Sequence, residues 1–277
     1  MQSEAQFEAR ETSRRRGYNR SIEALISKKN VLIAVILRDM RSRFFNHGLG
    51  FIMVPLWPLV HMGVLILIHS TAKSDPYFGD SLPLFFATGL VPTLTFMYVS
   101  RFMVLSIAMN KPMLSFPIVT TLDVMFGRAI LEILAACITL TLIMVILWIC
   151  DNNPWPIDLE TVVSAYLCVI FLALGCGFFI GVLSKAFPML VTAYQLFLIC
   201  IYITSGTMFV ASNLPDYISY MLSYNPITEC VEWIRTGYYD SYSDKLVHPY
   251  YIISIASATL LLGLGIERAF RRFFLEA

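Results

Sequence analysis

Long apolar segments separated by short polar stretches make up most of the chain. A helix that crosses a bilayer needs about 20 mostly apolar residues. Six segments approach or reach that length, at residues 51–68, 84–100, 129–149, 162–183, 189–210 and 251–266. The pattern therefore predicts an all-α polytopic membrane protein with six transmembrane helices. The fourth segment contains Gly175, Gly177 and Gly181, and such small residues allow neighbouring helices to approach closely.

The segment at 21–43, just before the first predicted span, has apolar residues at helical spacing. They are Ile22, Leu25, Ile26, Ile33, Ile36, Leu37 and Met40. Five bases share its remaining surface or its last turns, namely Lys28, Lys29, Arg38, Arg41 and Arg43. This pattern predicts an amphipathic helix along the cytoplasmic membrane face, with its bases near anionic headgroups. The helix either serves as a simple anchor or also docks a cytoplasmic partner.

A cytoplasmic loop is predicted at 101–128. A short semi-apolar piece at 113–119 follows Asn110-Lys111-Pro112 there and contains Phe116-Pro117. Proline suits the first turn of a helix, because its missing N–H has no partner to lose at that position. The loop is therefore either a short helix that transmits force from a soluble motor or an ordinary connection.

The outer segment at 211–249 is too apolar for a solvated loop of its length. Asn225-Pro226 interrupts it, since a residue before proline is disfavoured in the helical region. Beyond the break, one helical face is apolar and consists of Ile227, Cys230, Val231 and Ile234. On the same helix Glu232 and Arg235 are three residues apart and can pair. With a second short helix at 215–223, the pattern predicts two re-entrant half-helices in the outer leaflet between spans five and six.

Composition narrows the class of protein. Of the 277 residues, 57% are apolar and 14% are charged, whereas soluble domains have about 45–50% and 25%. The mean hydropathy is +0.69. A soluble enzyme, a disordered tail protein and a disulfide-rich secreted module are therefore excluded.

The net charge of +1 hides an uneven distribution of charge. Seventeen of the 20 basic residues lie in the N-terminal segment, the 101–128 loop, at Lys185 or in the C-terminal tail. The opposite set of loops holds ten acidic residues and only Lys73, Arg235 and Lys245 as bases. The excess of bases in cytoplasmic loops places both termini in the cytoplasm.

Motifs of common catalytic chemistries are missing from the sequence. It has no GxxxxGK[ST] loop, HExxH motif or GxSxG motif, so it predicts neither ATP hydrolysis by this chain nor a metal site. Cysteine spacing also suggests no zinc site or disulfide framework. Glu132 lies one turn from Arg128, and this spacing predicts a structural ion pair near the cytoplasmic boundary.

Aromatic residues are frequent at the predicted membrane boundaries and in the outer segment. Belts of Trp and Tyr at the two interfaces explain most of them. Their faces can also stack on sugar rings, so a path for a glycan is a chemically reasonable alternative.

Several short motifs follow one another in a fixed order from about residue 20 to the C-terminus. They lie at 38–44 (RDMRSRF), 49–50 (LG), 55–58 (PLWP), 110–112 (NKP), 114–117 (LSFP), 225–227 (NPI) and 232–237 (EWIRTG). Together with the predicted helices, this ordered set resembles the ABC-2 type transporter permeases. Within that class it is similar to the capsular polysaccharide export permeases of Gram-negative bacteria.

The resemblance implies a multi-pass inner-membrane permease subunit that forms a homodimer and binds two separate ATP-binding subunits. The chain would then not be an enzyme and would bind no cofactor itself, because ATP and Mg belong to the partner ATPase. Its substrate would be a lipid-linked capsular polysaccharide, with no role for nucleic acid. Capsule systems add a periplasmic polysaccharide copolymerase and an outer-membrane channel.

The resemblance also implies a division of the chain and a set of functional residues. The parts are a charged extension (1–19), an interface helix (20–50), a six-span domain (51–268) with a coupling segment (106–122) and an outer re-entrant segment (211–250), and a cytoplasmic tail (269–277). The ATPase-coupling residues would be Asn110, Lys111, Pro112, Met113, Leu114, Phe116 and Pro117. The substrate path would include Arg38, Arg41, Arg43, Trp57, Glu232, Trp233, Arg235, Tyr238 and Tyr239.

Other functions fit a similar topology. An exporter of O-antigen, teichoic acid or a drug belongs to the same class. An ion-coupled secondary transporter or a membrane enzyme that modifies glycans belongs to a different one.

Overall fold

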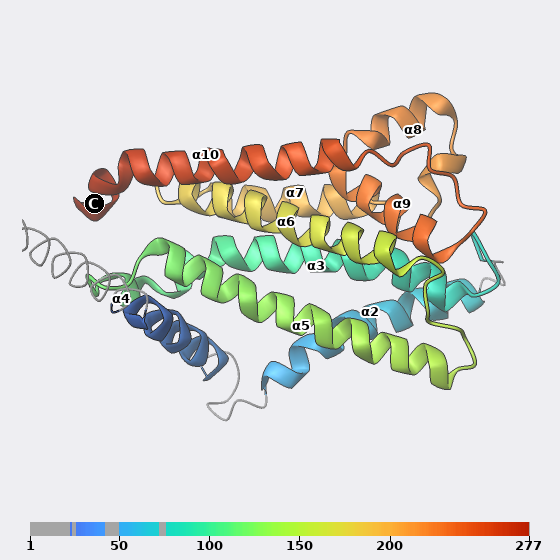
Figure 1. Ribbon diagram of the computed structural model, residues 1–277, viewed down its shortest axis with the longest axis horizontal. Coiled ribbons are helices and arrows are strands. Elements are labelled where there is room, and N and C mark those ends of the chain that lie inside the picture. The colour runs from blue at the N-terminus through green and yellow to red at the C-terminus, as the bar shows by residue number, and fades with distance from the viewer. Residues whose placement is uncertain (1–22, 24–25, 42–49, 72–75, 277) are drawn as a thin grey trace, which may run out of the picture.

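The computed structural model describes residues 23, 26–41, 50–71 and 76–276, and these residues form helices and loops without a β-strand. The long helices run side by side along one axis (Figure 1). Their bounds are α2 Gly50–Thr71, α3 Leu82–Met109, α5 Thr121–Ile149, α6 Leu159–Ser184 and α10 Pro249–Glu276. The shorter elements are α4 Lys111–Leu114, α7 Leu190–Thr204, the 3-10 turn η1 Ala211–Asn213, α8 Asp216–Ser223 and α9 Pro226–Tyr238.

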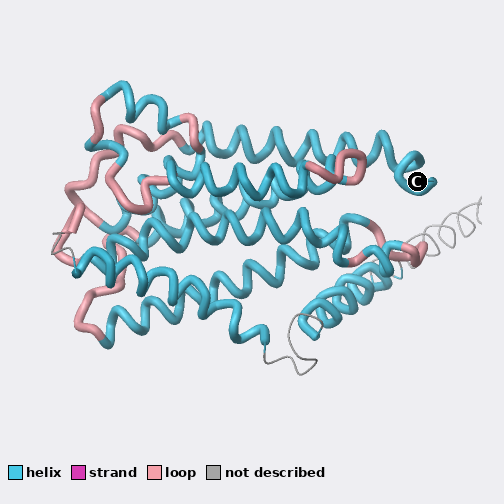
Figure 2. The backbone as a smooth tube through the Cα atoms, turned by 180° about the vertical axis from the view of Figure 1, so that it is seen from behind, coloured by secondary structure: helices cyan, strands magenta, loops and turns pink. Residues whose placement is uncertain are grey.

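The two ends of the bundle carry different elements. One end, called here the α4 end, holds α4, the helix at 26–41 and the last turns of α10 (Figure 1). The other, called the α8 end, holds α8 and the loops that join α5 to α6 and α9 to α10 (Figure 1). The view from behind shows that most of the loop residues gather at this α8 end (Figure 2). The segments that the sequence assigns to opposite membrane faces therefore lie at opposite ends of the molecule.

Within the described residues, five helices are long and apolar enough to cross a membrane: α2, α3, α5, α6 and α10. The sequence predicts six spans, so the structure differs at the fifth, where α7 ends at Thr204 after 15 residues. The physical reason lies in contacts made by α9. The side chain of Asn225 donates to the carbonyl of Ile201 at 3.2 Å, and the hydroxyl of Thr228 donates to the carbonyl of Thr204 at 2.7 Å. These contacts replace the next helical turn, and Gly206 follows with a φ of +75°.

Local sequence signals explain where several helices begin. Ser81 caps α3 by accepting from the amide of Leu84, and Asp158 caps α6 by accepting from two amides. Thr120 and Asp123 form a capping box at the start of α5. Asn225 caps α9 ahead of a proline in the first turn. Such side chains satisfy amides that have no partner inside the helix.

The helix α6 packs at the centre of the bundle against α3, α9 and α10. Its glycines make this close approach possible, as the sequence predicts. A Cβ atom at Gly177 would lie 2.9 Å from the Cα atom of Ser100 on α3. A Cβ atom at Gly175 would lie 2.5 Å from the carbonyl oxygen of Ala256 on α10. A larger side chain at either position would force the helices apart.

Candidate functional site

The helix at 26–41 lies against the start of α5 at the α4 end. Val35 is fully buried against this surface, where Gly127 of α5 leaves room for it. Near the N-terminal part of this helix, the ammonium of Lys28 contacts the carboxylate of Asp123 at 2.7 Å. Ile33 and Leu37, from the apolar stripe that the sequence identifies, remain exposed. An apolar face is thus left on the side away from α5, where the sequence predicts contact with the membrane.

An ion-pair cluster joins this helix to α5. The guanidinium of Arg128 is buried and donates to Glu132 Oε1 at 3.0 Å and to Asp39 Oδ2 at 3.2 Å. It also lies over the ring of Phe102 on α3, with 4.7 Å between the guanidinium carbon and the ring centroid. The predicted pair of Arg128 and Glu132 is confirmed. Sequence reasoning missed Asp39, because 89 positions separate it from Arg128 and no spacing rule relates them.

The predicted coupling segment forms a single helical turn, α4, that begins at Lys111. Pro112 occupies its first turn as predicted, but the helix ends at Leu114 and does not continue through 119. The hydroxyl of Ser115 donates to the carbonyl of Pro112 at 2.7 Å, and such side-chain bonds compete with further helix. Pro117 then lacks the amide that another turn would need.

The seven predicted coupling residues differ in their accessibility. Asn110 is buried, and its amide oxygen accepts from Arg38 of the helix at 26–41 at 3.2 Å. Lys111, Pro112, Phe116 and Pro117 are exposed, and Met113 and Leu114 are half-buried. This exposed turn and the helix at 26–41 therefore meet at one place, through Asn110 and Arg38.

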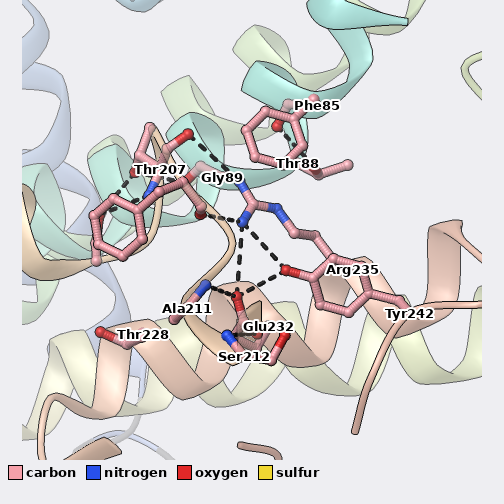
Figure 3. Close-up of polar contacts among 12 residues, drawn as sticks. Phe85, Thr88, Gly89, Thr207, Ala211, Ser212, Thr228, Glu232, Arg235 and Tyr242 are labelled. Carbon is pink, nitrogen blue, oxygen red and sulfur yellow. Dashed lines mark hydrogen bonds and ion pairs between the residues drawn. The ribbon is translucent and has the colours of Figure 1, made fainter. Parts of the chain in front are cut away.

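A second polar cluster lies at the α8 end, around Glu232 of α9 (Figure 3). The carboxylate of Glu232 accepts from the amides of Ala211 and Ser212 at 3.1 and 3.2 Å. It also accepts from the hydroxyl of Tyr242 at 2.7 Å. The predicted pair with Arg235 is confirmed at 3.7 Å. Glu232 thus joins α9 to the segment that follows α7 and to the loop before α10.

Arg235 extends the same cluster toward α3 (Figure 3). Its guanidinium donates to the carbonyls of Phe209 at 3.0 Å and Thr207 at 3.4 Å. Its central carbon lies 4.0 Å from the ring centroid of Phe85. Glu232 and Arg235 have no accessible side-chain surface, so in this conformation they connect elements of the fold and are closed to solvent.

The other residues predicted for the substrate path lie in several places. Trp233, Tyr238 and Tyr239 are half-buried on or just after α9, and the ring of Tyr239 packs against Phe78 with 5.2 Å between centroids. Arg41 is exposed at the α4 end. Arg43 lies outside the described residues. The eight predicted residues that the structure describes therefore lie at several places along the bundle.

Trp57 belongs to a groove between α2 and α3. The groove has a volume of about 740 Å³ and is lined by Met53, Val54, Leu56, Trp57, Val60, Tyr98, Arg101 and Phe102. The side chain of Trp57 is 66% exposed there. Sequence reasoning named Trp57 but missed the three residues of α3, because only the packing of the two helices brings them together.

Metal chemistry finds no support in the described part of the chain, where no three His, Cys, Asp or Glu residues gather into a group.

Asp158, which caps α6 outside the spans, has a carboxyl group with a lowered pKa. Hydrogen bonds from the hydroxyl and amide of Thr161 and from the amide of Glu160 lower this pKa below its ordinary value. This carboxylate is therefore ionised at neutral pH and serves the helix start.

Comparison with known proteins agrees with this architecture. The family model for ABC-2 type transporters matches residues 30–239, which include the helix at 26–41 from its fifth residue onward and extend through α9. That range covers more than half of the chain. The chain belongs to the ABC-2 type transporter family.

Curated relatives cover almost the whole chain. The polysialic acid transport protein KpsM of Escherichia coli is 28% identical over 242 residues, which cover 87% of this chain and 93% of the relative. The capsule polysaccharide export inner-membrane protein CtrC of Neisseria meningitidis serogroup B is 26% identical over 250 residues, or 90% and 94% of the two chains. The corresponding protein BexB of Haemophilus influenzae is 23% identical over 250 residues, with the same coverage.

Proposed function

We propose that this chain is the membrane subunit of an ATP-driven exporter that moves lipid-linked capsular polysaccharide across the inner membrane. The observation that carries the proposal is its similarity, over about nine-tenths of its length, to proteins named for transport of polysialic acid or capsule polysaccharide. The sequence has no phosphate-binding loop of the GxxxxGK[ST] kind. ATP and Mg would therefore bind to a partner subunit, and the chain itself would hold no cofactor.

The α4 end is the part of the molecule that would meet this ATPase. The exposed residues Lys111, Pro112 and Phe116 offer a contact surface there, beside the helix at 26–41. The excess of basic residues in the corresponding segments would place this end, and both termini, in the cytoplasm. Two ATP-binding subunits would then serve two copies of the permease.

A homodimer would cover part of the apolar surface that one chain leaves exposed. The outward faces of α2 and α7 carry large apolar side chains, including Val60, Leu67, Leu196, Phe197 and Ile203. Facing helices from two copies could enclose a path between them. In capsule export the path would lead to a periplasmic copolymerase and an outer-membrane channel.

The topology of six crossings is part of the proposal. At about 1.5 Å per residue, α7 is roughly 22 Å long and shorter than the 30 Å hydrocarbon core. The segment at 205–225 would complete its crossing, and α8 and α9 would form the re-entrant segment at the outer face. The hydrogen bonds from Asn225 and Thr228 to the last carbonyls of α7 support this arrangement.

In this mechanism, closure of the ATPases on ATP would push on α4 and on the helix at 26–41. The buried contact between Asp39 and Arg128 would pass the movement to α5, and the stacking of Arg128 on Phe102 would pass it to α3. Opening between the two copies would then admit the glycolipid. At the outer face, α9 is held by Glu232 and Arg235, so its release or retention would govern the exit.

Two measurements test the proposed function. In the first, this chain is expressed in a host whose own export permease gene has been deleted, and the capsule on the cell surface is measured. The second is mild-detergent purification of the tagged chain with mass spectrometry of the proteins that accompany it. We expect restored capsule and a near-stoichiometric subunit that carries a phosphate-binding loop.

The alternatives predict different results in these two experiments and in an export assay with vanadate or a proton uncoupler. Accumulation of polymer outside the cell that is insensitive to vanadate but abolished by a proton uncoupler would indicate an ion-coupled transporter. Restoration of O-antigen display in place of capsule would keep the ABC-2 mechanism and change the substrate. A chain that purifies without an ATPase under gentle extraction would contradict the proposal.

A further inference from the structure

Arg101 is a charged residue inside a helix of membrane-spanning length. It lies on α3, eight residues before Met109 at the α4 end, which corresponds to about 12 Å along the helix axis. A charged side chain in the hydrocarbon region is costly unless a partner compensates it, and charges inside spans commonly mark a binding site or path. The contacts of Arg101 therefore decide whether the protein itself compensates this charge.

The protein compensates Arg101 less fully than it does the other two arginines of its interior. Arg128 and Arg235 each contact a carboxylate, on Glu132 and Glu232 respectively. Arg101 donates to the side-chain oxygen of Gln195 on α7 at 3.2 Å and lies 5.8 Å from the ring centroid of Phe102. Among the residues that the structure describes, no carboxylate lies within ion-pair distance of it, and its buried Nε has no hydrogen-bond partner.

Arg101 is one of the residues that line the groove between α2 and α3. Residues 53, 54, 56, 57 and 60 of α2 form an apolar wall, and Tyr98 and Phe102 flank Arg101 on α3. Three aromatic rings and one cation thus line a space of about 740 Å³, within the range of small-molecule sites. This set suits an amphiphile with an oxyanion, because a guanidinium binds oxyanions through paired hydrogen bonds and aromatic faces contact sugar rings.

We propose that this groove binds an oxyanion, phosphate or carboxylate, of the lipid-linked glycan, with Arg101 as its cation. The inference rests on the proposed function and names the part of the substrate that this side chain recognises. Trp57, Tyr98 and Phe102 contact the adjoining sugars or lipid. The aromatic walls favour the glycan over an ordinary phospholipid, whose phosphate carries no sugar ring to stack on them.

Equilibrium binding tests this site. The probe is fluorescently labelled lipid-linked polysaccharide extracted from cells that lack the permease, added to the purified permease–ATPase complex in phosphatidylcholine nanodiscs. The variants are Arg101→Gln, which removes the charge, Arg101→Lys, which keeps it, and Trp57→Ala, which removes one wall. Lys245→Gln is the matched control, because it removes an exposed cation that pairs with Asp216 at the start of α8, away from the groove.

Loss of charge-assisted hydrogen bonds weakens binding by about tenfold or more. We therefore expect the dissociation constant to rise at least tenfold for Arg101→Gln, to rise less for Arg101→Lys, and to stay unchanged for Lys245→Gln. Trp57→Ala should weaken binding while leaving its dependence on salt intact. Equal affinity of Arg101→Gln and the unmodified complex would overturn the proposal.

A second set of nanodiscs separates the glycan from bulk lipid. If phosphatidylglycerol in the discs competes with the probe at Arg101, the groove holds ordinary anionic lipid and the assignment to the substrate fails. If binding is unaffected by phosphatidylglycerol, the glycan is supported as the occupant. Capsule restoration by the unmodified chain remains an independent measure, so failure of this site is distinguishable from failure of the proposed function.

Discussion

The guanidinium of Arg128 lies 3.2 Å from the carboxylate of Asp39, and both side chains are buried. This contact joins the helix at 26–41 to α5, and Arg128 also holds Glu132 one turn further along its own helix. Removal of one member of such a cluster leaves charge buried without compensation, which is more costly than the absence of the whole cluster. The relationship therefore makes a quantitative prediction about each of its members.

Arg128→Gln should lower the free energy of unfolding by about 3–5 kcal/mol, because two buried carboxylates then lose their ion pairs with this guanidinium. Thermal unfolding of the purified protein in detergent measures the loss. Lys245→Gln, which breaks an exposed ion pair with Asp216, is the control and should have little effect. Similar melting temperatures for the two variants would show that the buried cluster stabilises the protein no more than an exposed ion pair does.

Glu232→Ala should destabilise the α8 end by a comparable amount, about 3–5 kcal/mol, because Arg235 would stay buried without a carboxylate. Glu232→Gln should cost less, since its amide oxygen can still accept from Tyr242 or a backbone amide. Limited proteolysis of the segment at 205–225, together with thermal unfolding, reports the change. Glu160→Gln, at an exposed position near the start of α6, serves as the control, and an equal effect there would contradict the assignment.

Gly177→Ala should destabilise the protein by about 1–3 kcal/mol, because the added methyl group would meet the backbone of Ser100 at 2.9 Å and push α3 from α6. Gly63→Ala is a matched control, since a Cβ atom there meets nothing within 4 Å in the chain. That control should be neutral or slightly stabilising, because alanine favours a helix more than glycine does. Thermal unfolding of both variants measures the effect. An unchanged melting temperature for Gly177→Ala would mean that α3 and α6 can move apart without loss of stability.

Phe116→Ala should reduce recovery of the ATPase with the tagged chain, by about tenfold if Phe116 anchors the contact. The side chain is 61% exposed, so its removal should leave the melting temperature unchanged. Trp155→Ala is matched to it, because Trp155 is 66% exposed but lies in the loop at the α8 end. Equal recovery of the ATPase by Phe116→Ala and Trp155→Ala would argue against the exposed segment at 111–117 as the contact.

Asp158 gives a prediction for pH dependence. The pKa of Asp158 is lowered by its hydrogen bonds with Thr161 and Glu160, so its folded-state pKa lies below the unfolded value of about 3.9. Its carboxylate therefore contributes stability above pH 4, and this contribution is lost as the pH falls through the folded-state pKa. Melting temperatures of the unmodified chain and Asp158→Asn should differ at pH 7 and converge toward pH 3. A constant difference over this range would contradict the assignment.

The sequence predicted much of the fold because its signals are local. Runs of apolar residues located α2, α3, α5, α6 and α10, and Asn225-Pro226 located the boundary between α8 and α9. The end of α7 could not be predicted in this way. The residues at 205–210 are as uncharged as the helix before them. The carbonyls of Ile201 and Thr204 accept from Asn225, the cap of α9, and from Thr228, some 20 positions later in the sequence.

The polar clusters also contain some contacts that local sequence signals predict and others that they do not. Pairs within one helix, Arg128 with Glu132 and Glu232 with Arg235, follow from a spacing of three or four residues. No periodicity identifies Asp39, Tyr242 or Arg101, because their partners lie on other elements of the chain. The sequence placed Arg101 at the start of the predicted loop at 101–128, whereas α3 continues to Met109 and α5 already begins at Thr121.

The short helix α7 has a consequence for how the protein enters the membrane. A 15-residue helix covers about 22 Å of a bilayer core that is about 30 Å thick. The carbonyls of Ile201 and Thr204 in its last turn accept from the side chains of Asn225 and Thr228. During synthesis, α7 therefore emerges from the ribosome before the residues that complete its C-terminal end. In the proposed topology of six crossings, the contacts from Asn225 and Thr228 form only after α9 has been made, so α7 and α9 would complete this part of the bundle together.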